Sequence, residues 1–577
     1  MSFVLCPIGF PIVFPANASA PVVYAAGELS RYLQRMDGVE HNHKASFKGF
    51  CLRLSVEAKD LTDGAFRITI SKDGILIEAG VPAGIVYGSY ALLERFGCRF
   101  LACDCEIIPD SLQPLEEGVF EEHPAFAVRE LFWREAMDGA FAVKLRLNSA
   151  RSSITPEQGG KAMFYNFSHT FNTLIPVEKY FDSHPEYFSM IDGKRLRERT
   201  QLCLTNPDVL KLCVEGVKKW IRDNPEYTIF SVAMNDWYNV CRCPACRAID
   251  DEEESGAGTM IRFVNVVADE VAKEVPHVMI HTFAYLYCRK PPKYTKPRSN
   301  VIIRLCSIEC CFAHPIDSCG CETGPIDVQY ASAKGFMGDP KAESSFLRDL
   351  RSWSKWCDHL YIWDYTTNYA NYLQPFPNLS VLASNLRTFR AAGVHGVFEQ
   401  GNFSHGRCSA LGQLKVYLLG KLLWNPNLDT EKLEDEFVNG YYGPAAIPMR
   451  EYVRLWHMEN RAFHAGIYDP PDAAYFSDEL VDKAWSLIKQ ALQLATENPY
   501  RERVEREALS IRYLLLARSD PNTEEHSRQV DEFAEDVRRL GITELFERKA
   551  LDDSFEVLRT SRYVKDRSKV RAISYPI

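Results

Sequence analysis

The stretch that decides the fold covers residues 260–284 and reads MIRFVNVVADEVAKEVPHVMIHTFA. Its first part, residues 260–275, is amphipathic and predicts a helix. Its last part, residues 278–284, is a short apolar run that predicts a buried strand. The same alternation continues on both sides, from about residue 122 to about residue 425. It predicts an α/β fold.

Eight strand candidates lie in this region: residues 127–134, 143–147, 163–169, 229–234, 278–284, 301–307, 359–363 and 396–398. Amphipathic stretches separate them, at residues 209–222, 260–275, 345–355 and 379–391. Eight strand-and-helix units over about 300 residues are typical of a (β/α)8 TIM barrel. The alternative is an open doubly wound sheet. It is disfavoured because no glycine-rich phosphate-binding motif follows any strand.

Two further domains flank the predicted barrel. Residues 1–120 predict a small α/β domain, with helices at residues 21–36 and 84–96 and a hairpin at residues 66–77. Residues 121–425 form the barrel, and residues 426–577 predict an α-helical C-terminal domain. The helical segments expected there are residues 430–440, 447–465, 478–497, 500–518 and 524–540.

The composition excludes several classes of protein. The chain has 577 residues, 46% of them hydrophobic and 25% charged, which excludes a disordered or collagen-like protein. Its net charge of −10 argues against a nucleic-acid partner. We expect no membrane partner, because no apolar stretch approaches the ~18–20 residues of a membrane span. Aromatic residues make up 12%, which suits binding of ring-shaped ligands.

The 18 cysteines are too few for a disulfide scaffold of this length. Their clustering is more typical of reduced thiols or a metal site. The N-terminus is apolar but lacks a basic n-region, and prolines interrupt it, so we expect a cytoplasmic protein rather than a secreted one. A homo-oligomeric assembly stays open.

Carboxylates follow four of the predicted strands, and the active site of a barrel lies at the carboxyl ends of its strands. These candidate catalytic residues are Asp236, Glu309, Asp364 and Glu399. Two carboxylates of different pKa can act as acid and base at a glycosidic bond. A carboxylate at a strand end is about as often a structural partner of an arginine, and Arg134, Arg146 and Arg304 lie on predicted strands.

Aromatic and amide side chains accompany these carboxylates. Aromatic rings stack on sugar faces and amides bracket hydroxyl groups, so an oligosaccharide is the expected substrate. The candidate substrate-binding residues are Arg134, His169, Asn235, Trp237, Tyr285, Trp363, Tyr365 and Gln400. For His169, an ordinary hydrogen-bonded histidine is the more common outcome.

Three cysteines follow the Asp236 strand end with the spacing Cys241-x-Cys243-x-x-Cys246. With a fourth ligand they could hold a structural zinc ion, and otherwise they are buried reduced thiols. The candidates for the fourth ligand are Cys310, Cys311, His314, Cys319 and Cys321. No cofactor is required by the expected chemistry. The acidic run at residues 250–254 is interpreted as a solvated loop.

Several motifs of the chain resemble those of a known bacterial family. The motifs that carry the resemblance are SVAMNDW, CRCPAC, FAYLYCRKPP, NVIIRLCSIECCFAHP, LYIWDYTTNY, GVFEQGN and KLLWNP. They resemble the domain-of-unknown-function 4838 family, which includes the family 163 endo-β-N-acetylglucosaminidases. The segment GIVYGSYALLERFGCRFL resembles the small domain that precedes the barrel in family 20 hexosaminidases and family 67 α-glucuronidases. Together the matches cover roughly residues 1–445.

The resemblance implies a glycoside hydrolase. In families 20 and 163 the 2-acetamido group of the substrate is the nucleophile, which implies a substrate-assisted, retaining mechanism. This chain has Asn235 and Asp236 where family 20 has an Asp-Glu pair, and its loop after Glu399 reads SHGRCS at residues 404–409. In family 67, Asp364 and Glu399 would match the two carboxylates, and the reaction would be inverting.

The roles of the carboxylates stay open at this level. Glu399 follows apolar Val397 and Phe398, which favours a raised pKa and the role of general acid. Asp236 or Asp364 would then be the ionised partner. The family 20 analogy instead favours Asp236 as the acid. A carbohydrate-binding protein on an inactive barrel and a zinc-dependent enzyme are the rival functions.

Overall fold

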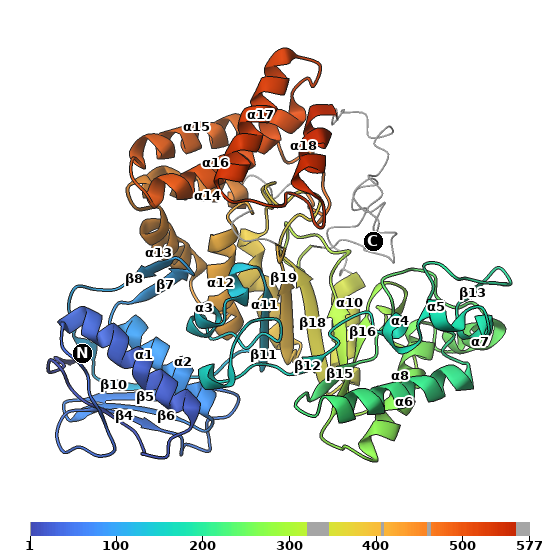
Figure 1. The fold of residues 1–577 in the computed structure, drawn as a ribbon, viewed down its shortest axis with the longest axis horizontal. Helices are drawn as coiled ribbons and strands as arrows, with labels where there is room; N and C mark the ends of the chain where they lie inside the picture. The colour runs from blue at the N-terminus through green and yellow to red at the C-terminus, as the bar shows by residue number, and fades with distance from the viewer. Residues whose placement is uncertain (1, 320–344, 405–408, 459–462, 561–577) are drawn as a thin grey trace. The chain divides into compact units, whose positions relative to one another are not determined.

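The computed structural model describes residues 2–319, 345–404, 409–458 and 463–560 (Figure 1). The chain divides into two compact units whose segments alternate along the sequence. The first unit consists of Met1–Ala162, Thr366–Leu386 and Glu399–Lys565, and the second of Met163–Tyr365, Arg387–Phe398 and Asp566–Ile577. Among the described residues, no helix is both long enough and apolar enough to span a membrane.

The first unit begins with a six-stranded mixed sheet of order β10-β5-β6-β4-β2-β3. Its strands are β2 (Ile12–Val13), β3 (His43–Lys44), β4 (Leu52–Ser55), β5 (Phe66–Ser71), β6 (Gly74–Ala79) and β10 (Gly118–Glu122). Helices α1 (Ala20–Asp37) and α2 (Pro82–Arg95) lie together on one face of this sheet (Figure 1). The predicted hairpin is β5 paired antiparallel with β6, and both predicted helices are confirmed. Two small ribbons pair β1 (Phe3–Val4) with β9 (Leu115–Glu116), and β7 (Arg99–Ala102) with β8 (Cys105–Ile107).

The C-terminal part of the first unit is helical, as predicted. Its helices are α12 (Gly412–Trp424), α13 (Thr430–Tyr442), α14 (Ala446–Met458), α15 (Asp478–Leu494), α16 (Tyr500–Arg518), α17 (Glu524–Arg539) and α18 (Leu551–Thr560). The five predicted segments correspond to α13–α17. Helix α15 begins where Ser477 accepts a hydrogen bond from the Leu480 amide, and α17 begins in the same way at Thr523.

One predicted strand is wrong. Residues 143–147 lie in helix α3 (Gly139–Lys144) and the turn that follows it. The alternation of apolar and charged residues suggested a half-exposed strand, but the charged side chains are buried in ion pairs. Lys144 contacts Glu106 at 2.5 Å and Arg146 contacts Glu94 at 2.6 Å. The apolar and the charged positions are therefore both internal, and the pattern carries no information about strand pleating.

The second unit is built on strands in the order β19-β18-β17-β16-β15-β12, and β12 to β18 pair in parallel. They are β12 (Phe164–Tyr165), β15 (Ile229–Ser231), β16 (Met279–Ala284), β17 (Val301–Cys306), β18 (His359–Tyr365) and β19 (Gly396–Gln400), whose last two residues belong to the first unit. Each matches a predicted strand, and the remaining prediction, residues 127–134, matches β11 (Val128–Phe132) of the first unit. Helices α6 (Pro207–Asp223), α7 (Pro244–Glu252), α8 (Ala257–Ala272), α10 (Ser345–Trp356) and α11 (Leu382–Ala391) lie between the strands in sequence.

This sheet is strongly curled. Adjacent strands lie about 4.8 Å apart, so a flat sheet would separate β12 from β19 by about 24 Å. Yet the ring centroids of Phe167, just after β12, and Phe398, on β19, are only 4.9 Å apart. The guanidinium of Arg304, on β17, lies inside the curl, 4.2 Å from the centroid of Phe167 and 5.6 Å from that of Phe398. The protein is therefore a mixed α/β protein with a curled, parallel half-barrel sheet and a helical C-terminal region.

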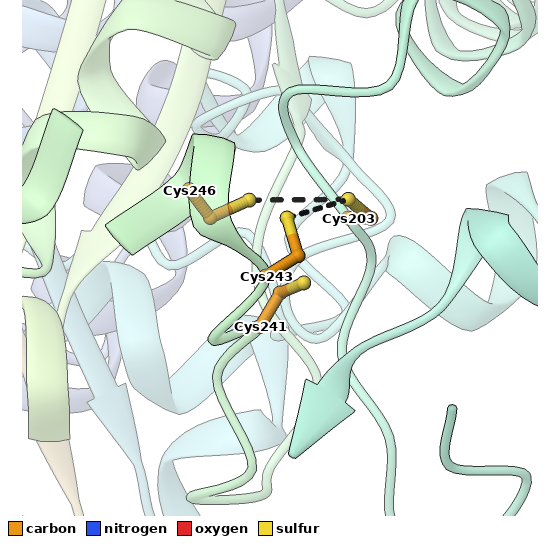
Figure 2. Close-up of side chains that lie close together, drawn as sticks. All are labelled: Cys203, Cys241, Cys243 and Cys246. Atoms are coloured by element: carbon orange, nitrogen blue, oxygen red, sulfur yellow. Dashed lines mark hydrogen bonds between the residues drawn. The ribbon is translucent and has the colours of Figure 1, made fainter. Parts of the chain in front are cut away.

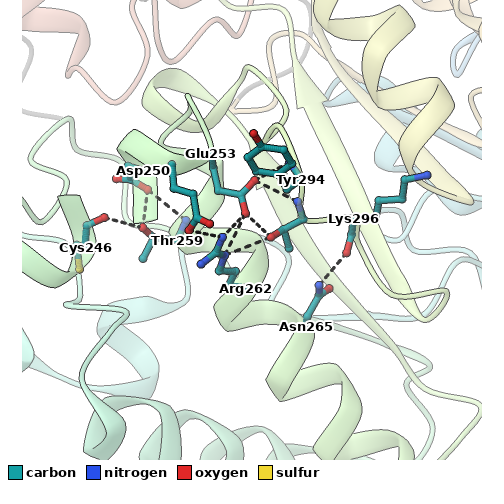
Figure 3. A network of polar contacts seen from close by, with 10 residues as sticks. Cys246, Asp250, Glu253, Thr259, Arg262, Asn265, Tyr294 and Lys296 are labelled. Carbon is teal, nitrogen blue, oxygen red and sulfur yellow. Dashed lines mark hydrogen bonds and ion pairs between the residues drawn. The ribbon is translucent and has the colours of Figure 1, made fainter. Parts of the chain in front are cut away.

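The acidic run at residues 250–254 lies at the end of α7 instead of in the predicted loop, and it is solvated only in part: Asp251, Glu252 and Glu254 are exposed, whereas Asp250 and Glu253 are buried. Glu253 is fully buried at the end of α7, where Arg262, the Thr295 hydroxyl and the amides of Tyr294 and Thr295 all donate to its carboxylate (Figure 3). Burial pushes the pKa of Glu253 up, but these donors outweigh it and hold the pKa at about 2. Asp250 accepts from Thr259 in the same network, which anchors α7 to α8.

Candidate functional site

Asp236 follows β15 and lies in the second unit. Its side chain is half-buried, and the hydroxyl of Tyr285, which follows the neighbouring strand β16, donates to its Oδ1 at 3.1 Å. The carboxyl ends of parallel neighbours meet at one edge of a sheet, which is why these two side chains, 49 residues apart in the sequence, come together. Asp236 thus remains partly open to solvent while one oxygen is held by a donor.

The backbone around Asp236 is fixed by Gln201. Its Nε2 donates to the carbonyl oxygens of Asn235, at 2.7 Å, and Trp237, at 2.6 Å, and its Oε1 accepts from the Asn235 amide at 2.8 Å. The side chain of Asn235 is itself occupied, because its Nδ2 donates to Thr200 O and its Oδ1 accepts from the Asn172 amide. Asn235 was predicted to bind substrate, and its described contacts hold the loop.

Several predicted aromatic residues gather near Asp236. The ring of His169 lies 6.4 Å from that of Tyr285, and its Nδ1 is 2.9 Å from Met234 O. His169 has a φ of 53°, a strained conformation that is common at functional sites. The rings of Trp363 and Phe283 are 5.6 Å apart. The second unit therefore combines a half-buried carboxylate, a tyrosine hydroxyl, an imidazole and aromatic rings at the carboxyl ends of its strands.

The remaining predicted aromatic residues have other neighbours. The half-buried ring of Trp237 lies under the guanidinium of Arg199, at 5.3 Å. Tyr365 is buried at the end of β18, with its ring 6.4 Å from that of Trp363 and 6.3 Å from that of Phe312.

Glu309 follows β17 and is buried, with 2% of its surface exposed. Arg289 donates to its Oε2 at 3.0 Å and to Asp349, on α10, at 2.8 Å. Among the described residues, the Oε1 of Glu309 has no hydrogen-bond partner. Burial raises the pKa of Glu309 and of Asp349, although the guanidinium of Arg289 opposes both shifts. The arginine partner of Glu309 is therefore Arg289, which sequence reasoning missed, and not Arg134, Arg146 or Arg304.

Asp364 is buried on β18 and takes a hydrogen bond from the hydroxyl of Ser307. Burial raises its pKa to about 6, against the lowering effect of that hydrogen bond. Side chains alternate along a strand, and the neighbouring Trp363 and Tyr361 have their rings 6.0 and 5.8 Å from the guanidinium of Arg304, inside the curl. Asp364 therefore points toward the opposite face of the sheet.

The other predicted residues lie in the first unit. Glu399 is buried near the end of β19, with 1% of its surface exposed. The carbonyl oxygen of Gln400 accepts from the Thr366 amide and hydroxyl and from Tyr369, each at 2.8 Å. The side chain of Arg134 is exposed, and its Nη1 lies 4.0 Å from Met137 Sδ.

The three predicted cysteines do converge, and a fourth joins them. Cys203, Cys241, Cys243 and Cys246 are buried and their sulfur atoms lie within 4.8 Å of one another (Figure 2). The fourth candidate ligand is therefore Cys203 and none of the residues proposed from sequence. Of those, Cys311, His314 and Cys319 gather in a second group of potential ligands, while Cys321 lies outside the described residues, as do residues 405–408 of the loop after Glu399.

Sequence reasoning missed three residues that shape this region: Gln201, Cys203 and Arg289. All three precede the residues that they contact, by up to 43 residues in the case of Cys203 and Cys246. A cysteine directly after the apolar Leu202 was a weak signal for Cys203. Nothing in the pattern around Gln201 marked it as the clamp of a distant loop.

Comparison with solved structures identifies proteins of similar fold. One is described as a novel family GH115 4-O-methyl-α-glucuronidase, BtGH115A, with specificity for decorated arabinogalactans. It has a TM-score of 0.55 and 10% identity, and the match covers 92% of this chain and 76% of that chain. A second is CpGH84B, with a TM-score of 0.47, 12% identity and 97% of both chains covered. A third is the N-acetyl-β-hexosaminidase of Streptomyces plicatus, with a TM-score of 0.44, 12% identity, and 76% of this chain and 91% of that chain covered.

At these identities the likeness shows the fold alone, and only the first match is close enough to support an argument. It shows that the chain shares its fold with a glycoside hydrolase. No curated protein matches the sequence. The profile of the domain of unknown function DUF4838 matches residues 100–454, which is more than half of the chain. The chain therefore belongs to the DUF4838 family.

Proposed function

We propose that this protein is a glycoside hydrolase that acts on oligosaccharides and that Asp236 is one of its catalytic carboxylates. The observation that carries the proposal is the pairing of half-buried Asp236 with the Tyr285 hydroxyl at the carboxyl ends of β15 and β16. This edge is where parallel α/β enzymes bind their substrates. The fold shared with a 4-O-methyl-α-glucuronidase supports the enzyme class.

The chemistry needs two carboxylates in different environments. A hydroxyl donor suits a carboxylate that stays ionised through the reaction, which is the role we assign to Asp236. In this role it orients the 2-acetamido group of a β-N-acetylglucosaminide or, in the alternative, activates a water molecule. Glu399, buried near the end of β19, is our candidate for the general acid. The ring of its neighbour Phe398 lies inside the curl, so alternation along β19 gives Glu399 the same face of the sheet as Asp364, and the leaving-group test below decides whether Glu399 or Asp236 is the acid. Reversed roles, with Asp236 as the acid, are the alternative that the test must separate.

Two substrate classes follow from this proposal. A β-N-acetylhexosaminidase or endo-β-N-acetylglucosaminidase would use the substrate's acetamido group as nucleophile and retain the anomeric configuration. An α-glucuronidase would instead use two protein carboxylates and invert the anomeric configuration. The fold shared with a 4-O-methyl-α-glucuronidase is the reason to test glucuronides as the second substrate class. The remaining alternative is a carbohydrate-binding protein without turnover. The complete (β/α)8 barrel is part of the same proposal.

The test uses aryl glycosides of N-acetylglucosamine and of glucuronic acid, with the anomer of the first product followed by NMR. Asp236→Asn should lower kcat/KM by about 10²–10⁴. Asp269→Asn, an exposed residue paired with Arg298, is the matched control. Binding of the same glycosides is measured in parallel by calorimetry. Binding without turnover would establish the binding protein, and full activity of Asp236→Asn would remove Asp236 from the site.

Leaving-group dependence separates the roles of the carboxylates. Glu399→Gln should slow substrates with poor leaving groups far more than activated aryl glycosides, because only the former need protonation. The same selectivity in Asp236→Asn instead would reverse the two roles. Equal loss on both kinds of substrate in Glu399→Gln would show that Glu399 is not the acid.

A further inference from the structure

We propose that Cys203, Cys241, Cys243 and Cys246 bind one zinc ion, and that this ion anchors the loop that carries Asp236. The sulfur atoms of Cys203 and Cys243 are 3.7 Å apart, and those of Cys203 and Cys246 are 3.9 Å apart (Figure 2). Tetrahedral zinc with Zn–S bonds of about 2.3 Å places its sulfur ligands about 3.8 Å from one another. These two distances match that spacing, and the remaining sulfur pairs of the cluster lie within 4.8 Å of one another.

These distances distinguish the cluster from a disulfide. A disulfide needs sulfur atoms about 2.05 Å apart. All of the cysteines in the described part of the chain are unbonded thiols. Four thiols converging on one point also exceed what apolar packing requires, since a small hydrophobic side chain would fill the same space without reactive sulfur.

Polar groups surround the cluster and lie close to its sulfur atoms. The Met190 amide donates to Cys241 Sγ at 3.3 Å, and Arg195 lies 3.7 Å from the same atom. The hydroxyl of Thr205 lies 3.2 Å from Cys246 Sγ. A zinc ion with four thiolates has a net charge of about −2, so N–H and O–H donors and a nearby cation beside the sulfur atoms are the groups that offset this charge. The donor set is therefore suited to the metal.

The four ligands come from two separate segments. Cys243 is the N-cap residue of α7 and Cys246 lies in its first turn, so the helix orients both. Cys203 comes from the segment before α6, 40 residues from Cys243. A bound ion would close this 40-residue loop, and its binding free energy would add to the stability of the second unit.

The segments that the ion would join are those that hold Asp236. Gln201, two residues before Cys203, clamps the backbone on both sides of Asp236, and Cys241 follows Asp236 by five residues. Four protein ligands leave no open coordination position, so the ion is structural and takes no part in the reaction. Its effect on activity rests on the proposed function, whereas its presence does not.

The experiment measures metal content in the full-length protein. Purified wild type is compared with Cys203→Ala and with Cys213→Ala, a buried cysteine of α6 outside the cluster. The zinc content of Cys203→Ala should be lower by one equivalent per chain, and that of Cys213→Ala unchanged. The difference is used because Cys311, His314 and Cys319 form a second group of potential ligands. Equal zinc in wild type and Cys203→Ala would overturn the site.

A second measurement covers the case in which Cys203→Ala fails to fold. Wild type is stripped of metal and titrated with Co²⁺, which reports ligand type and geometry through its absorption spectrum. A tetrahedral spectrum with sulfur-to-cobalt charge transfer supports the proposal, and an octahedral spectrum or no binding overturns it. Iron in place of zinc in the purified protein would overturn the identity of the metal.

Separate measurements test whether the ion anchors the loop that carries Asp236. Metal removal should lower Tm and increase proteolysis within residues 200–246, whether or not the protein hydrolyses any glycoside. If turnover is present, kcat should fall together with zinc content and recover on adding zinc alone. A stable loop in the metal-free protein would refute the anchoring role, while absence of turnover in the zinc-loaded protein would refute only the proposed hydrolase function.

Discussion

Each unit contains a buried cluster of charged side chains, and the two clusters differ in the sign of their net charge. In the first unit, Glu94 lies between Arg146 and Lys421, so one carboxylate has two cations. In the second unit, Arg289 lies between Glu309 and Asp349, so two carboxylates share one cation.

The pKa shifts of the carboxyl groups follow the number of cations per carboxylate in each cluster. Burial pushes the pKa of Glu94 up, but Arg146 and Lys421 outweigh it and hold the pKa at about 2. Burial also raises the pKa of Glu309 and Asp349, and the single arginine does not reverse it. The number of cations per carboxylate, and not burial by itself, therefore decides which protonation state the fold stabilises. Through these ion pairs Glu94 connects α2 to α12 and to the turn after α3.

The largest effect is expected from Arg289→Leu. It removes the cation that contacts both buried carboxylates, which should lower the free energy of unfolding by about 3–5 kcal/mol. Urea denaturation followed by circular dichroism measures the change. Arg298→Leu is the control, because Arg298 pairs with Asp269 at the surface and an exposed pair contributes only ~0–1 kcal/mol. Equal stability of the two variants would show that Arg289 does not hold the cluster together.

Glu94→Gln should be the next most damaging change. Its lowered pKa, from 4.5 to about 2, corresponds to about 3 kcal/mol of stability at neutral pH. A carboxylate with a lowered pKa stabilises the fold above pH 4.5, and this stability is lost as the pH falls toward 2. The stability difference between wild type and variant should therefore be full at pH 7 and shrink below pH 4.5. Glu121→Gln, at an exposed position, should leave stability near that of wild type.

Glu309→Gln should show the opposite dependence on pH. A carboxyl group with a raised pKa stabilises the fold at low pH, and this contribution is lost as the pH rises through its folded-state pKa. The glutamine carries no charge, so the variant should gain stability relative to wild type as the pH rises from 4.5, the ordinary pKa of a glutamate, to neutral pH. Denaturation at both ends of that range checks the sign. The same pH slope for Glu94→Gln and Glu309→Gln would contradict the comparison.

The sequence was informative where pattern and burial agree. The apolar runs at residues 278–284 and 301–307 are buried on both faces of a parallel sheet, and such runs identify central strands. The strand predicted at residues 143–147 is wrong because Lys144 and Arg146 are buried in ion pairs with Glu106 and Glu94. No local sequence pattern reveals these partners.

The candidate site was predicted only in part for a similar reason. Strand-end position correctly brought Asp236 and Tyr285 together, because it follows from the parallel topology. Position does not say which way a side chain points, and Glu309 and Asp364 turned out to be buried with internal partners. Contacts between distant segments, such as Cys203 with Cys243, depend on the tertiary fold and have no local signature.

The smallest effect is expected from Asp364→Asn, the variant that separates a buried structural carboxylate from the proposed catalytic one. Removal of the charge should favour the fold above pH 6, because the pKa of Asp364 is raised to about 6. The new amide group is buried, and an unsatisfied donor there costs about 1–3 kcal/mol, which offsets the gain. The shift from 3.8 to about 6 corresponds to about 3 kcal/mol, so the net change in the free energy of unfolding should stay within about 2 kcal/mol. Because Asp364 is buried and its carboxylate accepts a hydrogen bond from the Ser307 hydroxyl, we expect kcat/KM to remain within about tenfold of wild type, against a loss of about 10²–10⁴ for Asp236→Asn. A loss as large as that of Asp236→Asn, in a variant of unchanged stability, would place Asp364 among the catalytic residues.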